Sequence, residues 1–313
     1  ITLDGGTNTV TTGPGNDNIT ISGGANTIST GSGRDSFTIS NGSNEVTTGT
    51  ENDVLNILGG SNTINSEFGD DELTVSGGTN NLNSGAGDDT IQGRDNLKVL
   101  GGDGDDSLTG GASYFDGGAG DDTITLPGDM SPYLVDYLDG GTGSDTLILT
   151  GQFGSSSFGS TEIGQAIVNF EQITFAGGYT APAFTLGSQA ASAGETLTVN
   201  ISGYYAQNFV SNSAADITFN GGDWTNADNL GDTVTLGSGN DTISLFKGND
   251  TITAGAGNDN IDGGEGTDIA IFSGNKSDYT FEYKTVGLVE TITVTGTDGT
   301  DTVSNIETLR FDD

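Results

Sequence analysis

Aspartate recurs at a constant spacing through the first third of the chain. Five such residues lie 18 positions apart: Asp17, Asp35, Asp53, Asp71 and Asp89. The turn before them has the form Gly-x-Gly-x-Asp, as at residues 13–17. Ca²⁺ takes about six to eight hard oxygen ligands, and glycine permits the dihedral angles that bring several carbonyls of one turn together. A phased column of such turns therefore has the chemistry of a row of calcium sites.

The same turn recurs elsewhere in the chain. With longer insertions between them, further copies lead to Asp106, Asp122 and Asp145. A second array near the other end repeats every nine residues, at Asp232, Asp241, Asp250, Asp259 and Asp268. In this second array every half-turn carries the aspartate, so we expect calcium along both of its edges.

Asparagine takes the place of aspartate in alternate half-turns of the first array. These residues are also 18 positions apart: Asn8, Asn26, Asn44, Asn62 and Asn80. Asparagine keeps a hydrogen-bonding side chain but removes the anion. We therefore expect a calcium column along one edge of the first array and an asparagine ladder along the other.

Short strands must position these turns. Apolar residues stand two and four positions after the aspartates of the first array, as at Ile19 and Ile21. Strand alternation places both on one face. One rung buries only a few apolar side chains, so it is stable only when it is stacked on its neighbours. The periodicity predicts a solenoid and argues against the disordered chain that the composition alone would allow.

These turns resemble the RTX (repeat-in-toxin, hemolysin-type calcium-binding) family, whose nonapeptide is Gly-Gly-x-Gly-x-Asp-x-apolar-x. The resemblance implies an all-β fold, a right-handed parallel β-roll (β-solenoid) in two arrays, each with a β-rich cap. It also implies that the thirteen aspartates named above are metal ligands. That number of turns suggests on the order of ten Ca²⁺ ions.

Three turns depart from the family pattern. Glu51 and Glu67 stand where the turn has a glycine, and Arg34 places a cation next to Asp35. We expect weaker calcium binding at these turns.

The repeats divide the chain into four predicted parts. Residues 1–150 form the first β-roll, 151–229 a cap and β-rich insert, 230–273 the second RTX array and 274–313 the C-terminal cap. In the insert, Tyr204, Tyr205 and Trp224 would suit a ligand or glycan platform, but a small β-rich insert is the simpler interpretation. Aromatic and Met residues between the later turns are expected to cover the end of the first stack: Tyr114, Phe115, Met130, Tyr133 and Tyr137.

The two arrays are followed by the same short motif. Residues 169–175 and 305–311 both read Asn-apolar-Glu-x-apolar-x-Phe. A solenoid needs a cap because an open end exposes a strand edge and the apolar core. This ending resembles the C-terminal flank of many RTX proteins, which is associated with type I secretion.

Composition excludes several classes of function. The chain has 44 Asp+Glu against 7 Lys+Arg, a formal net charge of −37, and neither Cys nor His. Thiolate and imidazole metal sites are therefore excluded, as are nucleophile systems that need either residue. The charge opposes binding to nucleic acid and to anionic membranes, and no apolar run approaches the roughly 18 residues of a membrane span. About ten bound Ca²⁺ would bring the formal charge to roughly −17.

The chain begins within a repeat and without a signal peptide, so we expect a fragment or processed piece of a longer secreted protein. The favoured interpretation is a calcium-dependent extracellular structural or adhesive module: an S-layer, adhesin or surface-filament component whose folding is driven by Ca²⁺. Its expected partners are calcium ions, copies of itself in a lattice or filament, and cell-surface glycan.

The sequence supports three other functions less well. The alternative is the C-terminal secretion and folding domain of a type I-secreted enzyme or toxin. We do not expect the chain to be an enzyme, because the paired carboxylates that glycoside hydrolysis needs are already assigned to calcium. Ice binding by a threonine column is disfavoured because Glu45 and Asn81 interrupt that column.

Overall fold

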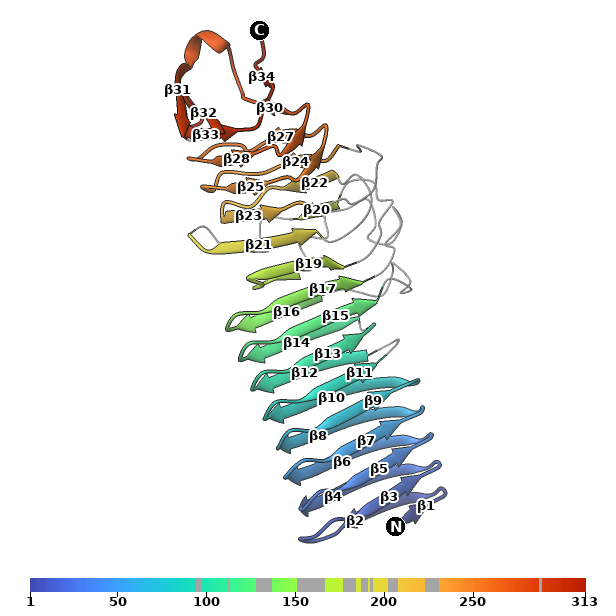
Figure 1. Ribbon diagram of the computed structural model, residues 1–313. Coiled ribbons are helices and arrows are strands. Elements are labelled where there is room, and N and C mark those ends of the chain that lie inside the picture. The colour runs from blue at the N-terminus through green and yellow to red at the C-terminus, as the bar shows by residue number, and fades with distance from the viewer. Residues whose placement is uncertain are drawn as a thin grey trace. The chain divides into compact units, whose positions relative to one another are not determined.

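The computed structural model describes eleven stretches of the chain, and the fold is taken from these: residues 1–93, 97–111, 113–127, 137–150, 167–176, 184–186, 191, 194–201, 208–222, 231–286 and 289–313. Met130, Tyr133, Tyr204, Tyr205 and Trp224 lie outside the described residues. The chain forms two compact units, Ile1–Leu147 and Ile148–Asp313. Strands make up most of the described residues of each unit (Figure 1).

Each rung of the first unit has one long and one short strand. The long strands are β2 (Thr7–Thr11), β4 (Ala25–Ser32), β6 (Ser43–Thr50), β8 (Ser61–Phe68), β10 (Thr79–Ala86), β12 (Leu97–Asp103), β14 (Tyr114–Ala119) and β16 (Tyr137–Thr142). The short strands are β1 (Thr2–Leu3), β3 (Asn18–Ile21), β5 (Ser36–Ile39), β7 (Val54–Ile57), β9 (Glu72–Val75), β11 (Thr90–Gly93), β13 (Ser107–Gly110) and β15 (Thr123–Pro127), with β17 (Thr146–Thr150) starting at the end of the unit. Long strands pair in parallel with long strands, and short with short.

The 18-residue repeat sets the register of this roll. Ile19 pairs with Phe37, and Phe37 pairs with Leu55 on the next rung. All three side chains are buried, because alternate residues of every strand point between the two sheets. The first unit is thus a parallel β-roll, as the resemblance to RTX repeats implies.

Tyr114, Phe115 and Tyr137 do not cover the end of the stack, contrary to the sequence-based expectation. Phe115 is fully buried in the core. Tyr114 and Tyr137 point to the outer face of β14 and β16, where their rings stack with centroids 5.0 Å apart. The Lys98 ammonium lies 4.7 Å from the centre of the Tyr114 ring. These residues belong to ordinary rungs because their strands keep the repeat register despite the insertions between them.

Most strands of the second unit pair in parallel in two sets. One holds β19 (Gln172–Ala176), β21 (Thr196–Ile201), β23 (Asp216–Asn220), β25 (Thr242–Ser244), β28 (Asn260–Asp262) and β33 (Thr300–Ser304). The other holds β20 (Phe184–Leu186), β22 (Asn208–Ser211), β24 (Thr233–Thr235), β27 (Thr251–Thr253), β30 (Ile269–Ile271) and β34 (Thr308–Arg310). Two short strands, β26 (Lys247–Gly248) and β29 (Glu265–Gly266), pair separately, and β18 (Ile167–Val168) precedes β19. The described parts of residues 151–229 therefore form rungs of the same parallel type.

An antiparallel hairpin distinguishes the C-terminal end of the second unit. After a single 3₁₀ turn, η2 (Lys276–Asp278), β31 (Thr280–Val286) pairs with β32 (Val289–Thr295), which pairs with β33. The chain then returns to the roll, since β33 lies parallel to β28. Within the described residues, no helix has the length and apolar character needed to span a membrane.

Candidate calcium-binding turns

The aspartates of the first unit stack in register along one edge. The backbone N–H of Asp17 donates to Asp35 Oδ1 at 2.8 Å. The same contact continues at 2.7–2.8 Å through Asp53, Asp71, Asp89, Asp106, Asp122 and Asp145. All are buried except Asp17, which is half-buried on the first complete turn. The structure thus brings together the eight predicted ligands of this unit as a single ladder.

The second oxygen of most of these carboxylates has no hydrogen-bond partner. This holds, among the described residues, for the buried Oδ2 atoms of Asp35, Asp53, Asp71, Asp89, Asp106 and Asp122. Burial raises the pKa of Asp71 to about 7 and that of Asp106 to about 8, because desolvation disfavours the charged form. A buried carboxylate without a donor or cation is unfavourable. The ladder is therefore incomplete without a bound cation.

Serine or threonine hydroxyls line the ladder where the RTX consensus has its first glycine. The hydroxyls of Thr48 and Ser84 lower the pKa of Asp53 and Asp89, although desolvation by burial outweighs them. Their protons are nevertheless donated to carbonyls of the following rung, at 3.0 Å to Ser66 and 2.7 Å to Gly101. These hydroxyls therefore do not satisfy the buried Oδ2 atoms.

Glycine provides the space for these oxygens in the later turns. A Cβ on Gly101 would collide with Asp106 Oδ2, and one on Gly117 would collide with Asp122 Oδ2. Carbonyl oxygens of the stacked turns lie equally close to the chain: a Cβ on Gly33, where φ is +118°, would come 2.7 Å from the Gly15 carbonyl oxygen. Carboxylate and carbonyl oxygens in one turn are the donor set that Ca²⁺ prefers.

Backbone carbonyls must supply a large share of the ligands. No group of three or more His, Cys, Asp or Glu side chains that could hold a metal ion occurs in the described part of the chain. One aspartate per turn with neighbouring carbonyls still fits calcium, which accepts both in flexible geometry. When bound, the ion would neutralise the buried carboxylates and link successive turns.

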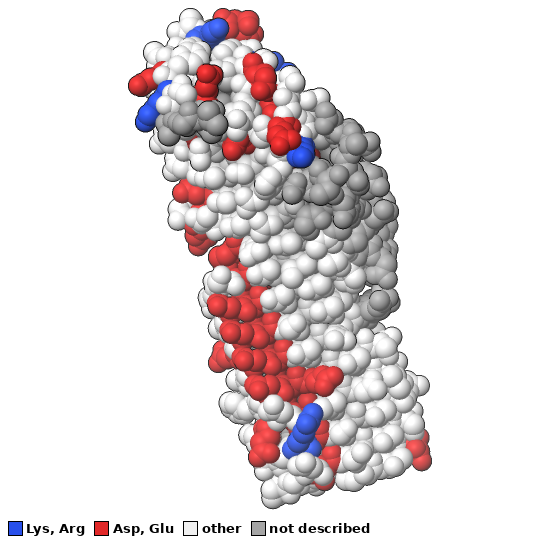
Figure 2. All heavy atoms as spheres, in the orientation of Figure 1, with Lys and Arg blue, Asp and Glu red and all other residues white. Residues whose placement is uncertain are grey.

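A second, exposed ladder runs beside the first with its hydrogen bonds reversed. The N–H of Asp88 donates to Asp70 Oδ1 (3.1 Å), that of Asp105 to Asp88 (3.0 Å) and that of Asp121 to Asp105 (2.8 Å). The inner side chain of each turn thus reaches back one rung, and the outer one reaches forward. Acidic atoms form a continuous stripe on this face (Figure 2). Its sequence signal is the Asp or Asn that often precedes the phased aspartate, a position to which the repeat pattern assigns no role.

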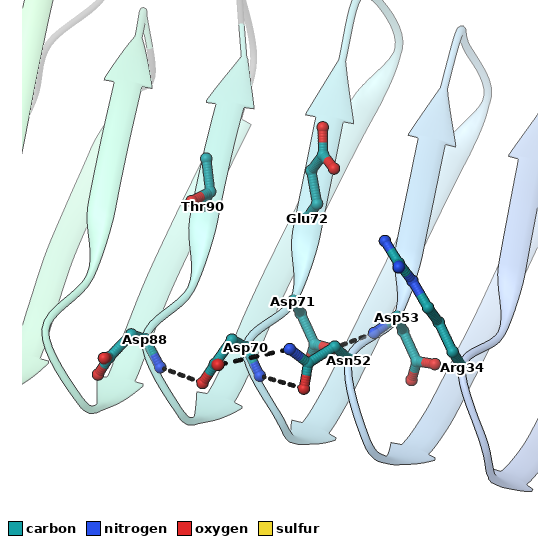
Figure 3. Close-up of a pocket in the computed structure, with 8 residues that line it drawn as sticks. All are labelled: Arg34, Asn52, Asp53, Asp70, Asp71, Glu72, Asp88 and Thr90. Atoms are coloured by element: carbon teal, nitrogen blue, oxygen red, sulfur yellow. Dashed lines mark hydrogen bonds between the residues drawn. The ribbon is translucent and has the colours of Figure 1, made fainter.

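The three turns that depart from the consensus lie near one groove. This groove of about 270 Å³ is lined by Arg34, Asn52, Asp53, Asp70, Asp71, Glu72, Asp88 and Thr90 (Figure 3). Glu51 and Glu67, which replace glycines here, have φ of 76° and 71°. A left-handed conformation costs a residue with a side chain roughly 1–2 kcal/mol. The stack therefore maintains the turn shape at these positions in spite of local strain.

In the second unit, alternate aspartates belong to two separate columns. In one, the N–H of Asp241 donates to Asp259 Oδ1 at 2.8 Å. In the other, the N–H of Asp232 donates to Asp250 Oδ1 at 2.6 Å, and the N–H of Asp250 donates to Asp268 Oδ1 at 2.7 Å. Buried Oδ2 atoms without a partner among the described residues again occur, at Asp241, Asp250, Asp259 and Asp268. The nine-residue spacing thus places an aspartate turn on both edges.

Two acids that end these columns are not predicted by the spacing. Asp301 Oδ1 accepts from the N–H of Asp259 at 2.9 Å, and Glu307 Oε2 accepts from that of Asp268 at 2.6 Å. The hairpin separates each acid from its partner by 42 and 39 residues, so no fixed period connects them. The sequence features that could point to these two acids are Gly296-x-x-Gly299-x-Asp301 and the Asn-apolar-Glu motif that contains Glu307.

The opposite edge of the first unit is a ladder of asparagines. Each amide donates to the Oδ1 of the next at 2.7 Å, from Asn8 through Asn26, Asn44 and Asn62 to Asn80. Each also donates to the carbonyl three residues before it. With its amide protons and oxygens used in this way, the ladder joins neighbouring rungs without a metal.

A comparison with protein families matches the RTX calcium-binding nonapeptide repeat (4 copies). The matched residues are 3–37, 38–73, 57–91, 74–96, 135–149, 227–254 and 237–270, about half of the chain. This chain is an RTX repeat protein. The RTX turns at Asp106 and Asp122 fall outside the matched ranges, yet they make the same contacts as the matched ones. No curated protein matches the chain significantly.

Proposed function

We propose that this RTX chain is a calcium-dependent structural or adhesive module of an extracellular surface: part of an S-layer, an adhesin or a surface filament. The observation that carries the proposal is that most of the ladder carboxylates have a buried Oδ2 without a hydrogen-bond partner among the described residues. Packing these carboxylates into columns opposes folding until a cation neutralises them. Calcium sites of extracellular modules are weak, with dissociation constants of about 10⁻⁴–10⁻³ M. Folding would therefore be restricted to calcium-rich surroundings outside the cell.

The distribution of polar side chains supports a scaffold over an enzyme. The phased aspartates are engaged in contacts between rungs, and the asparagines join rungs along the other edge. Repetition also gives long, regular faces, which suit repeated contacts with copies of the chain or with surface glycan. On this proposal the chain has no catalytic activity of its own, and it leaves the cell by type I secretion.

The second candidate is a C-terminal secretion and folding domain of a type I-secreted enzyme or toxin. The cap motif favours it, because Glu307 closes one aspartate column at the C-terminal end of the roll. In that case the calcium-driven fold serves export and refolding of a catalytic domain. The two candidates share the calcium chemistry and differ in self-assembly.

Circular dichroism tests the calcium-driven folding in this proposal, and electron microscopy tests the self-assembly. In millimolar calcium we expect a β spectrum, and chelation with EGTA should replace it with that of an unfolded chain. An unchanged spectrum in EGTA would contradict calcium-driven folding. Micrographs of the folded chain should then show lattices or filaments; dispersed single particles at all protein concentrations would favour the secretion domain.

A further inference from the structure

A turn outside the RTX repeats stacks on the last repeat turn of one column in the second unit. Residues 296–301 read Gly-Thr-Asp-Gly-Thr-Asp, with glycines five and two positions before Asp301, as in the repeat. Gly299 forms a parallel bridge with Gly257, and a Cβ on Gly299 would collide with the Gly257 carbonyl oxygen. After the hairpin, the chain therefore returns to make one more turn of the same form.

The contacts of this turn repeat those between consecutive repeats. The N–H of Asp259 donates to Asp301 Oδ1, and that of Thr300 donates to Asn258 Oδ1, both at 2.9 Å. The first has its counterpart one rung earlier, between Asp241 and Asp259 at 2.8 Å. The N–H of Gly257 also donates to the carbonyl of Asp298 at 2.7 Å. The stacking that brings carboxylate and carbonyl oxygens together in the repeats thus continues into the turn at residues 296–301.

Two carboxylate oxygens at this junction are buried and have no hydrogen-bond partner among the described residues. They are Oδ2 of Asp259 and Oδ1 of Asp298. Asp259 as a whole is 3% exposed, and Asp301 is 2% exposed. Within the described stretches, the ion pair that forms joins Lys247 to Glu265, so no lysine or arginine there neutralises these acids. Buried carboxylates in this position must be neutralised, either by a proton or by a cation from solution.

Asp298 also connects the calcium edge to the core of the cap. The Tyr279 hydroxyl lies 2.6 Å from Asp298 Oδ2. The Tyr279 ring packs against Phe272 and Phe311, with centroids 5.7 and 5.1 Å away, and Phe311 contacts Phe281 of the hairpin at 5.8 Å. One Asp298 oxygen therefore accepts from the tyrosine of this aromatic cluster, and the other is the buried Oδ1 that has no partner among the described residues.

We propose that Asp259 and Asp298, with carbonyl oxygens of the two stacked turns, bind a further calcium ion that fastens the C-terminal hairpin to the roll. Asp298 lies beyond residue 270, where the last RTX match ends. Calcium suits the site better than magnesium, because its larger and more flexible shell accepts several protein carbonyls without retained water. The hairpin then closes over the end of the roll only when this site is filled. With calcium present that end is covered, and without calcium it is exposed.

The experiment compares the full chain with its Asp298→Asn variant. Native mass spectrometry in calcium counts the bound ions, and hydrogen exchange follows the hairpin amides of residues 280–295. We expect Asp298→Asn to bind one ion fewer and its hairpin to exchange about tenfold faster or more, while the repeats keep their protection. Glu282→Gln is the matched control: Glu282 is exposed on β31, and the same loss of charge there should change neither readout.

A second variant separates metal binding from the tyrosine contact. Tyr279→Phe removes the hydroxyl but leaves the carboxylate, so it should keep the full ion count. The proposal is overturned if Asp298→Asn binds as many ions as the wild type. If that variant does not fold, hydrogen exchange of the wild-type hairpin at different calcium concentrations tests the proposal instead. Hairpin protection that persists after chelation overturns the proposal, and protection that appears only with the last ions bound supports it. Loss of this one site leaves binding by the repeats intact, so its failure is distinguishable from a failure of calcium-driven folding.

Discussion

Neighbouring aspartates in one turn have different surroundings. Asp89 is buried, and its Oδ2 lacks a partner among the described residues, whereas Asp88 is exposed on the outer ladder. Desolvation raises the pKa of Asp89 to about 6. The buried carboxylate, and not acid content in general, is therefore the expected calcium ligand of the turn.

Replacing each of these two residues tests that distinction. Asp89→Asn keeps the size of the side chain and an oxygen for the Asp71 N–H, which in the wild type donates to Asp89 Oδ1 at 2.7 Å, but removes the charge expected to bind calcium. Isothermal titration should show one site lost or weakened by about tenfold or more. Asp88→Asn is the control, with the same chemical change one residue away, and should leave the number of sites unchanged. Equal effects of the two variants would show that the stripe acts as a diffuse acidic surface.

At the level of the strands and turns, the two edges of the first unit use different chemistry to join the same rungs. The asparagine edge satisfies its own polar groups: Asn44 is 4% exposed, donates to Asn62 Oδ1 at 2.7 Å, and accepts from Asn26 at 2.7 Å. On most rungs of the aspartate edge, one carboxylate oxygen has no hydrogen-bond partner in the part of the chain that the structure describes. Rung stacking at the asparagine edge should therefore be independent of calcium.

The Asn44→Ala variant tests this independence. It leaves buried partners on two adjacent rungs unsatisfied, so it should lower the free energy of unfolding by about 1–3 kcal/mol in saturating calcium. The ion count should not change. Asn83→Ala, at an exposed asparagine bonded to Asn65 at 3.1 Å, is the matched control and should have little effect. Urea unfolding followed by circular dichroism measures the stability of both variants, and isothermal titration with calcium gives their number of bound ions. A changed number of ions in Asn44→Ala would mean that the two edges are coupled.

The rungs were predictable because their signal is local. A period of 18 places Ile19 over Phe37 and Asp35 over Asp53 with no further information, since stacked rungs of equal length must align. The exposed ladder was missed because its residues vary in type, with Arg34 and Asp70 at equivalent positions. Tyr114 and Tyr137 were wrongly expected at the end of the stack because the insertions between later turns hide their unchanged register.

The closing acids were beyond periodic analysis for a different reason. Asp301 joins its column only after an intervening hairpin, so its neighbour Asp259 is 42 residues away. A contact of that kind depends on how the cap packs, and a single sequence gives no period for it. The cap motif did mark Glu307. Only the structure shows that its carboxylate accepts from the Asp268 N–H, as the next aspartate of the column would. In both parts of the chain where this motif occurs, its asparagine has a left-handed backbone: φ is 55° at Asn169 and 52° at Asn305.

For the whole molecule, the buried ladders determine how stability depends on pH. Burial raises the pKa of Asp241 and Asp301 to about 7 and that of Asp122 to about 6, against about 3.9 in an unfolded chain. Between these values the metal-free folded state holds more protons than the unfolded state. Its free energy of unfolding should therefore fall as pH rises from about 4 through about 8, by up to about 1.4 kcal/mol per pH unit for each extra proton held.

Bound calcium should reverse this dependence. Protons compete with Ca²⁺ for the same carboxylates, so the calcium-saturated protein should lose stability as pH falls. Circular dichroism at about pH 5.5 and about pH 7.5, above the isoelectric point of about 4.1, measures both slopes. In the metal-free chain it follows the folded fraction, which should be larger at the lower pH, and in the calcium-saturated chain it follows the urea midpoint, which should be higher at the higher pH. The metal-free sample should be prepared by dialysis, because chelators are themselves protonated in acid. Added monovalent salt screens the exposed stripe but acts little on buried carboxylates, so the opposite slopes should persist in salt. Parallel slopes with and without calcium would show that the buried aspartates are not the metal ligands, and would remove the basis for calcium-driven folding.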